Sequence, residues 1–227
     1  PKVVEGGQPD AWVRSRRIVF YLLSIDMYGM IRGTAADVSF IIDMLPSYLF
    51  PNDERVVSLF AVTGKSLGGH AAWQVLTHEP RIRVGVSFIG TPDFQKLLAM
   101  RAHNSSLKDV PPTVPGTLRA LMRNVDPAAQ HYREVGSVNP FFGKKICSCS
   151  GADDKLVRFI YSEEFLRHLV VANPGSNEAQ NSLEIFVQPN TGHTVTPESA
   201  YTSVALTQCL RLVVAGLLSG LLPTKGQ

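Results

Sequence analysis

The chain has little cysteine, and its three cysteines do not have the spacing of a disulfide framework. Cys147 and Cys149 alternate along one apolar run, so we expect them on the same face of a strand without pointing at each other. Cys209 stands far from both in the sequence. We interpret all three as reduced thiols in the protein interior, which favours a cytoplasmic location.

Long hydrophobic runs and charge of one sign are also scarce. The apolar run 18–25 is too short to span a bilayer, and the run 204–222 is interrupted by Gln208 and Arg211. We expect the second run to belong to a packed C-terminal helix, 197–218, with no stable membrane insertion. The 22 basic and 19 acidic residues are scattered, which argues against a nucleic-acid partner.

The apolar segments that are present alternate between two patterns over 227 residues. Strand-like runs alternate with helical ones, which predicts a single domain, 1–227, with an α/β fold and an open, mostly parallel sheet. About five strands are expected, one of which, RVVSLFAV, has the β-branched composition of a strand buried on both faces. The expected strands are 17–25, 55–62, 82–89, 145–149 and 183–187. The expected helices are 37–49, with Pro46 bending or ending it, 67–78, 158–171 and 197–218.

The stretch 93–143 interrupts this alternation. It contains five prolines with short apolar pieces between them, and we predict that it lacks regular structure. An insert of that length is usually functional, and a lid over a site is the interpretation we favour. Its apolar residues are candidates for a substrate pocket or for simple packing of the lid onto the sheet. The candidate pocket residues are Phe94, Leu97, Met122 and Phe142, with Leu98, Met100, Leu118, Leu121 and Phe141 around them.

The segment 63–73, TGKSLGGHAAW, permits two interpretations. The letters GKS resemble the end of a phosphate-binding loop, but such a loop needs another glycine five residues before Gly64, where this chain has Leu59 in a predicted strand. The letters also fit the serine turn G-x-S-x-G, with a strand before the first glycine and a helix from Ser66 onward. In that turn the backbone N–H of Leu67 points to the place where an oxyanion would form. The surrounding strand and helix favour the second interpretation.

A nucleophilic serine needs a base, and the base needs an orienting acid. Six histidines are present, but only His193 lies in a loop directly after a late strand. A proline-containing helix start, TPE, follows that loop. For the acid, Asp153 and Asp154 both follow the strand 145–149. The sequence therefore offers a serine, an acid and a histidine in this order, each at the end of a predicted strand.

In this order and context the chain resembles the α/β-hydrolase superfamily. It is most similar to small intracellular hydrolases of the dienelactone-hydrolase-like or prolyl-oligopeptidase-like kind. The resemblance runs from about residue 33 to the end and rests on GKSLGGHAAW, NPFFGKKI, SGADDKLV and NTGHT. It implies that Asp154, three residues after Gly151, is the acid of a catalytic triad with Ser66 and His193, and Asp153 stays the second choice.

The resemblance also implies a reaction, acyl transfer from a small-molecule ester or thioester to water, which needs no metal and no organic cofactor. A peptidase or lactone hydrolase on the same fold is an alternative, and so is a catalytically weak binding protein. Such folds usually have eight strands, and the strands missing here are N-terminal ones. They include the strand whose following loop donates the second oxyanion N–H, for which Gly6 and Gly7 are candidate replacements.

Overall fold

A computed structural model describes residues 9–111 and 113–196 of the chain. Its strands form one sheet in which the spatial order follows the sequence, and each neighbouring pair is parallel. The strands are β1 (Phe60–Lys65), β2 (Ile82–Phe88), β3 (Lys145–Gly151) and β4 (Leu183–Gln188). Parallel neighbours require crossover connections, and helical segments supply them here. The predicted fold class, an open parallel α/β sheet, is confirmed, with four strands among the described residues and not five.

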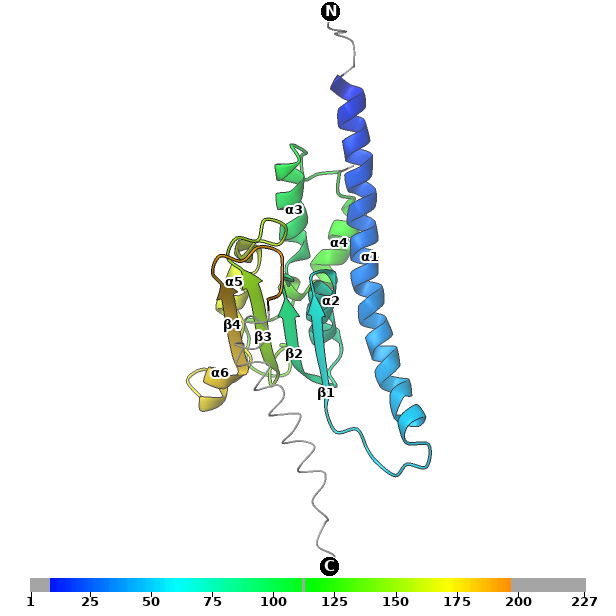
Figure 1. Ribbon diagram of the computed structural model, residues 1–227, viewed down its shortest axis with the longest axis vertical. Helices are drawn as coiled ribbons and strands as arrows, with labels where there is room; N and C mark the ends of the chain where they lie inside the picture. The colour runs from blue at the N-terminus through cyan, green and yellow to red at the C-terminus, as the bar shows by residue number, and fades with distance from the viewer. Residues whose placement is uncertain (1–8, 112, 197–227) are drawn as a thin grey trace, which may run out of the picture.

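The longest helix runs along the edge of the molecule. Figure 1 shows α1 beside β1 and α2, with α3 and α4 next to its N-terminal half. The helices are α1 (Pro9–Leu49), α2 (Leu67–His78), α3 (Phe94–Asn104), α4 (Gly116–Val125), α5 (Glu163–His168) and α6 (Asn177–Ser182). Two 3-10 turns, η1 (Pro127–Ala129) and η2 (Phe159–Tyr161), complete the crossovers. The predicted helix 158–171 is thus wrong in extent, because η2 and α5 replace it.

The segment 17–25 is part of α1, so its prediction as a strand is wrong. Its composition suits either element, but the buried side chains recur every three to four residues, as on one face of a helix. Phe20, Tyr28, Ile31 and Ala35 are buried on that face, whereas Ile18, on the opposite face, is 58% exposed. The segment 37–49 is helical as predicted, and the helix continues past Pro46 to end at Leu49.

The prediction of a strand buried on both faces at 55–62 is also wrong. β1 begins only at Phe60, and its residues alternate between half-buried and exposed. The preceding residues are mostly exposed, and Val56 is 88% exposed. Among the described residues β1 pairs with β2 alone. Edge strands show this alternation because one face packs on a helix while the other meets solvent, whatever their content of valine.

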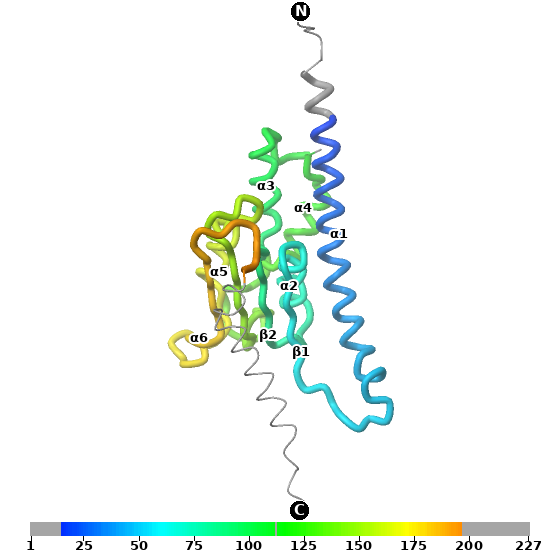
Figure 2. Tube along the Cα trace, viewed as in Figure 1, coloured from blue at the N-terminus to red at the C-terminus, as the bar shows by residue number. Residues whose placement is uncertain are grey.

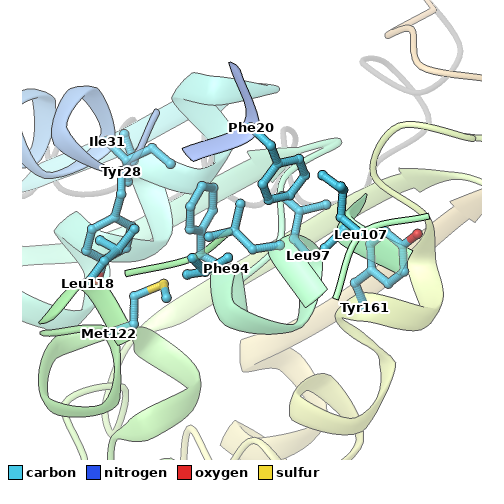
Figure 3. Close-up of a cluster of buried hydrophobic side chains, with 13 residues drawn as sticks. Phe20, Tyr28, Ile31, Phe94, Leu97, Leu107, Leu118, Met122 and Tyr161 are labelled. Atoms are coloured by element: carbon cyan, nitrogen blue, oxygen red, sulfur yellow. The ribbon is translucent and has the colours of Figure 1, made fainter. Parts of the chain in front are cut away.

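The stretch 93–143 has regular structure, contrary to prediction. It forms α3, η1 and α4, and the side chain of Asp93 caps α3 by accepting a hydrogen bond from the backbone N–H of Lys96 (2.7 Å). The buried apolar residues of α3 and α4 pack on α1. Figure 3 shows Phe20 of α1 over Leu97 and Leu107, and Tyr28 beside Leu118 and Met122.

The two cysteines of β3 lie on one face of the sheet and are both buried, as predicted. Their sulfur atoms are 3.5 Å apart, so the expectation that they do not meet is wrong. Side chains two residues apart on a strand share a face and can lean along it toward each other. The separation is well beyond the roughly 2.05 Å of a disulfide bond.

Several predictions fall outside the described residues. They concern the C-terminal helix 197–218, the apolar run 204–222, Cys209, and the glycines Gly6 and Gly7. Of the helices that the structure describes, none combines the length and apolarity needed to cross a bilayer.

Candidate active site

Ser66 occupies a strained turn between β1 and α2. Its backbone angles, φ 54° and ψ −112°, lie in a region that residues other than glycine rarely adopt. The Ser66 N–H donates to the carbonyl of Phe88 (2.9 Å), which ties the turn to β2. A Cβ on Gly64 would lie 2.0 Å from the carbonyl oxygen of Gly68, so the turn can close only with glycine at position 64. The serine is therefore held where a parallel sheet presents its carboxyl ends.

His193 reaches this turn from the far side of the sheet. Figure 2 shows the segment after β4 crossing above the upper ends of the strands toward β2. The Ser66 hydroxyl and His193 Nε2 are 2.8 Å apart, although 127 residues separate them in the sequence. This distance suits proton transfer between a hydroxyl and an imidazole. The structure thus brings the predicted nucleophile and the predicted base into direct hydrogen-bond contact.

Asp154 contacts the other nitrogen of the same imidazole. Its Oδ2 lies 2.7 Å from His193 Nδ1, and its Oδ1 accepts backbone N–H groups of Leu156 (2.8 Å) and Val157 (2.9 Å). The carboxylate side chain is fully buried, and that of His193 is 21% exposed. With both Asp154 oxygens engaged, the imidazole is held with Nδ1–H toward the acid and Nε2 free to accept the serine proton.

Backbone contacts hold the acid loop against the histidine loop. The N–H of Ala152 donates to Gln188 (2.9 Å), and that of Asp153 donates to Thr191 (2.9 Å). A Cβ on Gly151 would lie 2.3 Å from the carbonyl oxygen of Thr191, so the two loops touch only because this position is glycine. Asp153, the alternative acid, is exposed. The structure places Asp154, and not Asp153, against His193.

The candidate oxyanion donor is the backbone N–H of Leu67. Leu67 is the first residue of α2, and the first N–H groups of a helix have no acceptor within it. They also lie at the positive end of the helix dipole, which favours a developing negative charge.

His70 is a site neighbour that the sequence did not single out. It lies one turn after Ser66 on α2, and its backbone N–H donates to the Ser66 carbonyl (3.0 Å). Its ring Nδ1 accepts the N–H of Thr91 (2.9 Å), and burial lowers the pKa of His70 to about 4. The ring is therefore neutral at pH 7 and supports the loop after β2, so it does not compete with His193 as base.

The predicted pocket residues lie in the interior of the helical layer. Phe94, Leu97 and Met122 are at most 2% exposed and pack in one cluster with α1, while Phe142 is half-buried elsewhere. The ring of Tyr28 lies 5.3 Å from that of Phe94. Packing between helices accounts for the three buried side chains.

Asp126 is a second buried carboxylate that the sequence analysis missed. Its Oδ2 accepts the N–H of Phe94 (2.9 Å), and its Oδ1 accepts from Gln74 Nε2 (3.0 Å) and the Tyr28 hydroxyl (3.4 Å). Burial raises the pKa of Asp126 to about 7. No local signal marks this residue, because its partners lie 32 to 98 positions away in the sequence.

In its described part the chain has the open parallel α/β sheet that the sequence predicted. No family model matches the sequence, and no curated protein matches it.

Solved structures do match. SOBER1 from Arabidopsis thaliana aligns with a TM-score of 0.45 and 17% identity, covering 79% of this chain and 65% of that one. TT1662 from Thermus thermophilus gives 0.48 and 22%, covering 72% and 57%. The Pyrococcus furiosus esterase Pf2001 gives 0.43 and 16%, covering 77% and 60%. The chain thus spans less than two thirds of the length of each of these proteins.

Proposed function

We propose that this protein is a serine hydrolase that cleaves a small-molecule carboxylic ester or thioester through an acyl-enzyme. The observation that carries the proposal is the hydrogen-bond chain from Ser66 through His193 to Asp154, with separations of 2.8 and 2.7 Å. In this chain of contacts the imidazole and the buried carboxylate can activate the hydroxyl at neutral pH. The three residues come from the ends of β1, β3 and β4, so the sheet holds them in place.

In the first half of the proposed reaction, Ser66 Oγ attacks the carbonyl carbon of the substrate. His193 Nε2 takes the hydroxyl proton, and the backbone N–H of Leu67 donates to the oxyanion that forms. Asp154 accepts from Nδ1–H and stabilises the imidazolium. When the tetrahedral intermediate collapses, His193 gives its proton to the leaving alcohol or thiol, and the acyl group stays on Ser66.

In the second half, water takes the place of the leaving group. His193 removes a proton from water as it attacks the acyl carbon, and the same imidazole returns that proton to Ser66 Oγ as the carboxylic acid departs. These residues perform each step without a metal or organic cofactor. We also propose a cytoplasmic location, which the thiols of Cys147 and Cys149 support because they are not joined in a disulfide.

A fluorophosphonate probe tests the proposal, because it reacts with activated serines whatever the natural substrate. We expect the wild-type protein to be labelled and Ser66→Ala to be unlabelled. Ser58→Ala is the matched control, since Ser58 is an exposed serine just before β1. Absence of labelling in the wild type would favour a binding protein on this fold, and equal labelling after Ser66→Ala would show that Ser66 is not the nucleophile. Turnover of peptides or lactones in preference to esters would show one of the other hydrolase activities.

A further inference from the structure

Arg101 is a half-buried arginine on α3 that meets no strong acceptor among residues 9–111 and 113–196. Its Nη1 lies 3.3 Å from the thioether sulfur of Met27, and its Nη2 lies 3.5 Å from the carbonyl oxygen of Leu156. The first acceptor is weak and the second lies at the limit of hydrogen bonding. Arg101 is only partly buried, so part of its side chain stays in contact with solvent.

Other arginines of the chain have a carboxylate partner, and Arg101 differs from them in this respect. Within the described residues Arg101 has no carboxylate in salt-bridge range, whereas four other arginines do. These are Arg81, Arg119, Arg133 and Arg167. Moving a guanidinium out of water costs free energy that an acceptor normally offsets. Burial accordingly lowers the pKa of Arg101. A half-buried guanidinium without a carboxylate partner is suited to bind an anionic ligand.

The position of Arg101 relates it to the Ser66 site. Leu156, which it approaches through the carbonyl, donates its own N–H to Asp154, the acid that contacts His193. Burial and, to a lesser degree, the charge of Arg101 lower the pKa of His70, the neighbour of Ser66 on α2, and the charges of Tyr161 and Asp154 act on Arg101. The guanidinium therefore lies between α1, α3 and the acid loop, beside the carboxyl ends of the strands.

We propose that Arg101 is a substrate-binding residue that holds a carboxylate of the substrate, so that the protein prefers esters or thioesters carrying a negative charge near the scissile bond. The proposal rests on the serine hydrolase function proposed above. A guanidinium presents paired N–H donors that match the two oxygens of a carboxylate, and a charge-assisted contact of this kind orients a small substrate. The charge can lie on the acyl side or on the alcohol side.

Matched ester pairs test this preference. On the acyl side, 4-nitrophenyl hemiadipate is compared with 4-nitrophenyl hexanoate, and on the alcohol side 3-carboxyphenyl butyrate is compared with phenyl butyrate. In at least one pair, Arg101→Met should lower the ratio of kcat/KM for the anionic ester to that for the neutral ester by about 10- to 100-fold. Arg101→Lys should restore part of the ratio, because it restores the charge without the paired donors.

Arg123→Met is the control, since Arg123 is an exposed arginine on the neighbouring helix α4 and the same charge is removed. It should leave both ratios unchanged. If Arg101→Met lowers kcat/KM equally for both members of each pair, or changes nothing, Arg101 only supports the acid loop and the proposal is overturned.

Binding of adipate, followed by NMR titration, separates this proposal from the proposed function. If no ester is turned over but adipate binds the wild type and not Arg101→Met, the hydrolase function fails and the carboxylate site stands. If esters are turned over but Arg101→Met changes neither the kcat/KM ratios nor the binding of adipate, the hydrolase function stands and the carboxylate site at Arg101 is overturned.

Discussion

Two buried carboxylates lie in different regions of this molecule, Asp154 in the loop after β3 and Asp126 at the junction of α1, α2, α3 and α4. Both are 3% exposed. Asp154 accepts two backbone N–H groups, from Leu156 and Val157, and Asp126 likewise accepts the N–H of Phe94. Burial and backbone contacts therefore do not distinguish them.

The side chains that contact the two carboxylates do distinguish Asp154 from Asp126. The second oxygen of Asp154 meets an imidazole, which can share or carry a positive charge, whereas Asp126 meets the neutral groups of Gln74 and Tyr28. The pKa of Asp126 rises to about 7 because burial penalises its charged form, and the nearby charge of Asp93 adds to the effect. A perturbed carboxylate often marks an active site. Here that carboxylate holds helices together, and the geometry around Ser66 identifies the candidate acid.

The largest expected effect is that of Asp154→Asn. The amide keeps the shape but can present N–H to His193 Nδ1, which favours the wrong tautomer, and such a change lowers kcat by about 10⁴-fold in serine proteases. We expect a loss of similar order in kcat/KM with an activated ester. Asp126→Asn, the matched substitution in the other region, should stay within about threefold of wild type. Equal losses from the two substitutions would remove the distinction drawn between the carboxylates.

The next effect is a pH dependence of stability that Asp126 confers. An ordinary aspartate has a pKa near 3.8 and that of Asp126 is about 7, so between these values the folded chain holds a proton that the unfolded chain has lost. Its contribution to stability is therefore complete below pH 3.8 and is lost as pH rises through 7. Relative to Asp126→Asn, the free energy of unfolding of the wild type should fall by about 1–3 kcal/mol from pH 5 to pH 8.

Urea denaturation at pH 5, 6.5 and 8 measures this difference. Asp126→Asn is a suitable reference because its side-chain oxygen can still accept the N–H of Phe94. If the wild type and the variant give parallel curves over this range, Asp126 is ionised in the folded protein and burial does not raise its pKa.

The same contrast explains which parts of the site the sequence could predict. Ser66, Asp154 and His193 each follow a strand within a recognisable local pattern, and parallel strands bring their carboxyl ends to one edge. Asp126 and His70 have no such pattern. Their roles depend on contacts with helices and loops distant in the sequence, such as that between Asp126 and Gln74, which only the packed structure reveals.

The fold could be predicted where periodicity and composition agree. The helix 67–78 and the strands at β2, β3 and β4 meet that condition. The two wrong strand predictions failed because composition alone does not report surroundings. The run 17–25 is apolar although only one face of α1 packs on α3 and α4, and the run 55–62 is rich in valine although half of its residues are exposed. The burial of a segment depends on its position in the folded protein, which the composition of that segment alone does not reveal.

The smallest expected effect sharpens the comparison within the acid loop itself. Asp153 and Asp154 are sequence neighbours after the same strand, yet the side chain of Asp153 is exposed and that of Asp154 is buried against His193. Asp153 contributes its backbone N–H, which donates to Thr191, and Asp153→Asn preserves that group. We expect kcat/KM within about twofold of wild type and a change in unfolding free energy below about 0.5 kcal/mol. If Asp153→Asn lowered kcat/KM as far as Asp154→Asn, the acid would act through the loop charge and not through contact with His193 Nδ1.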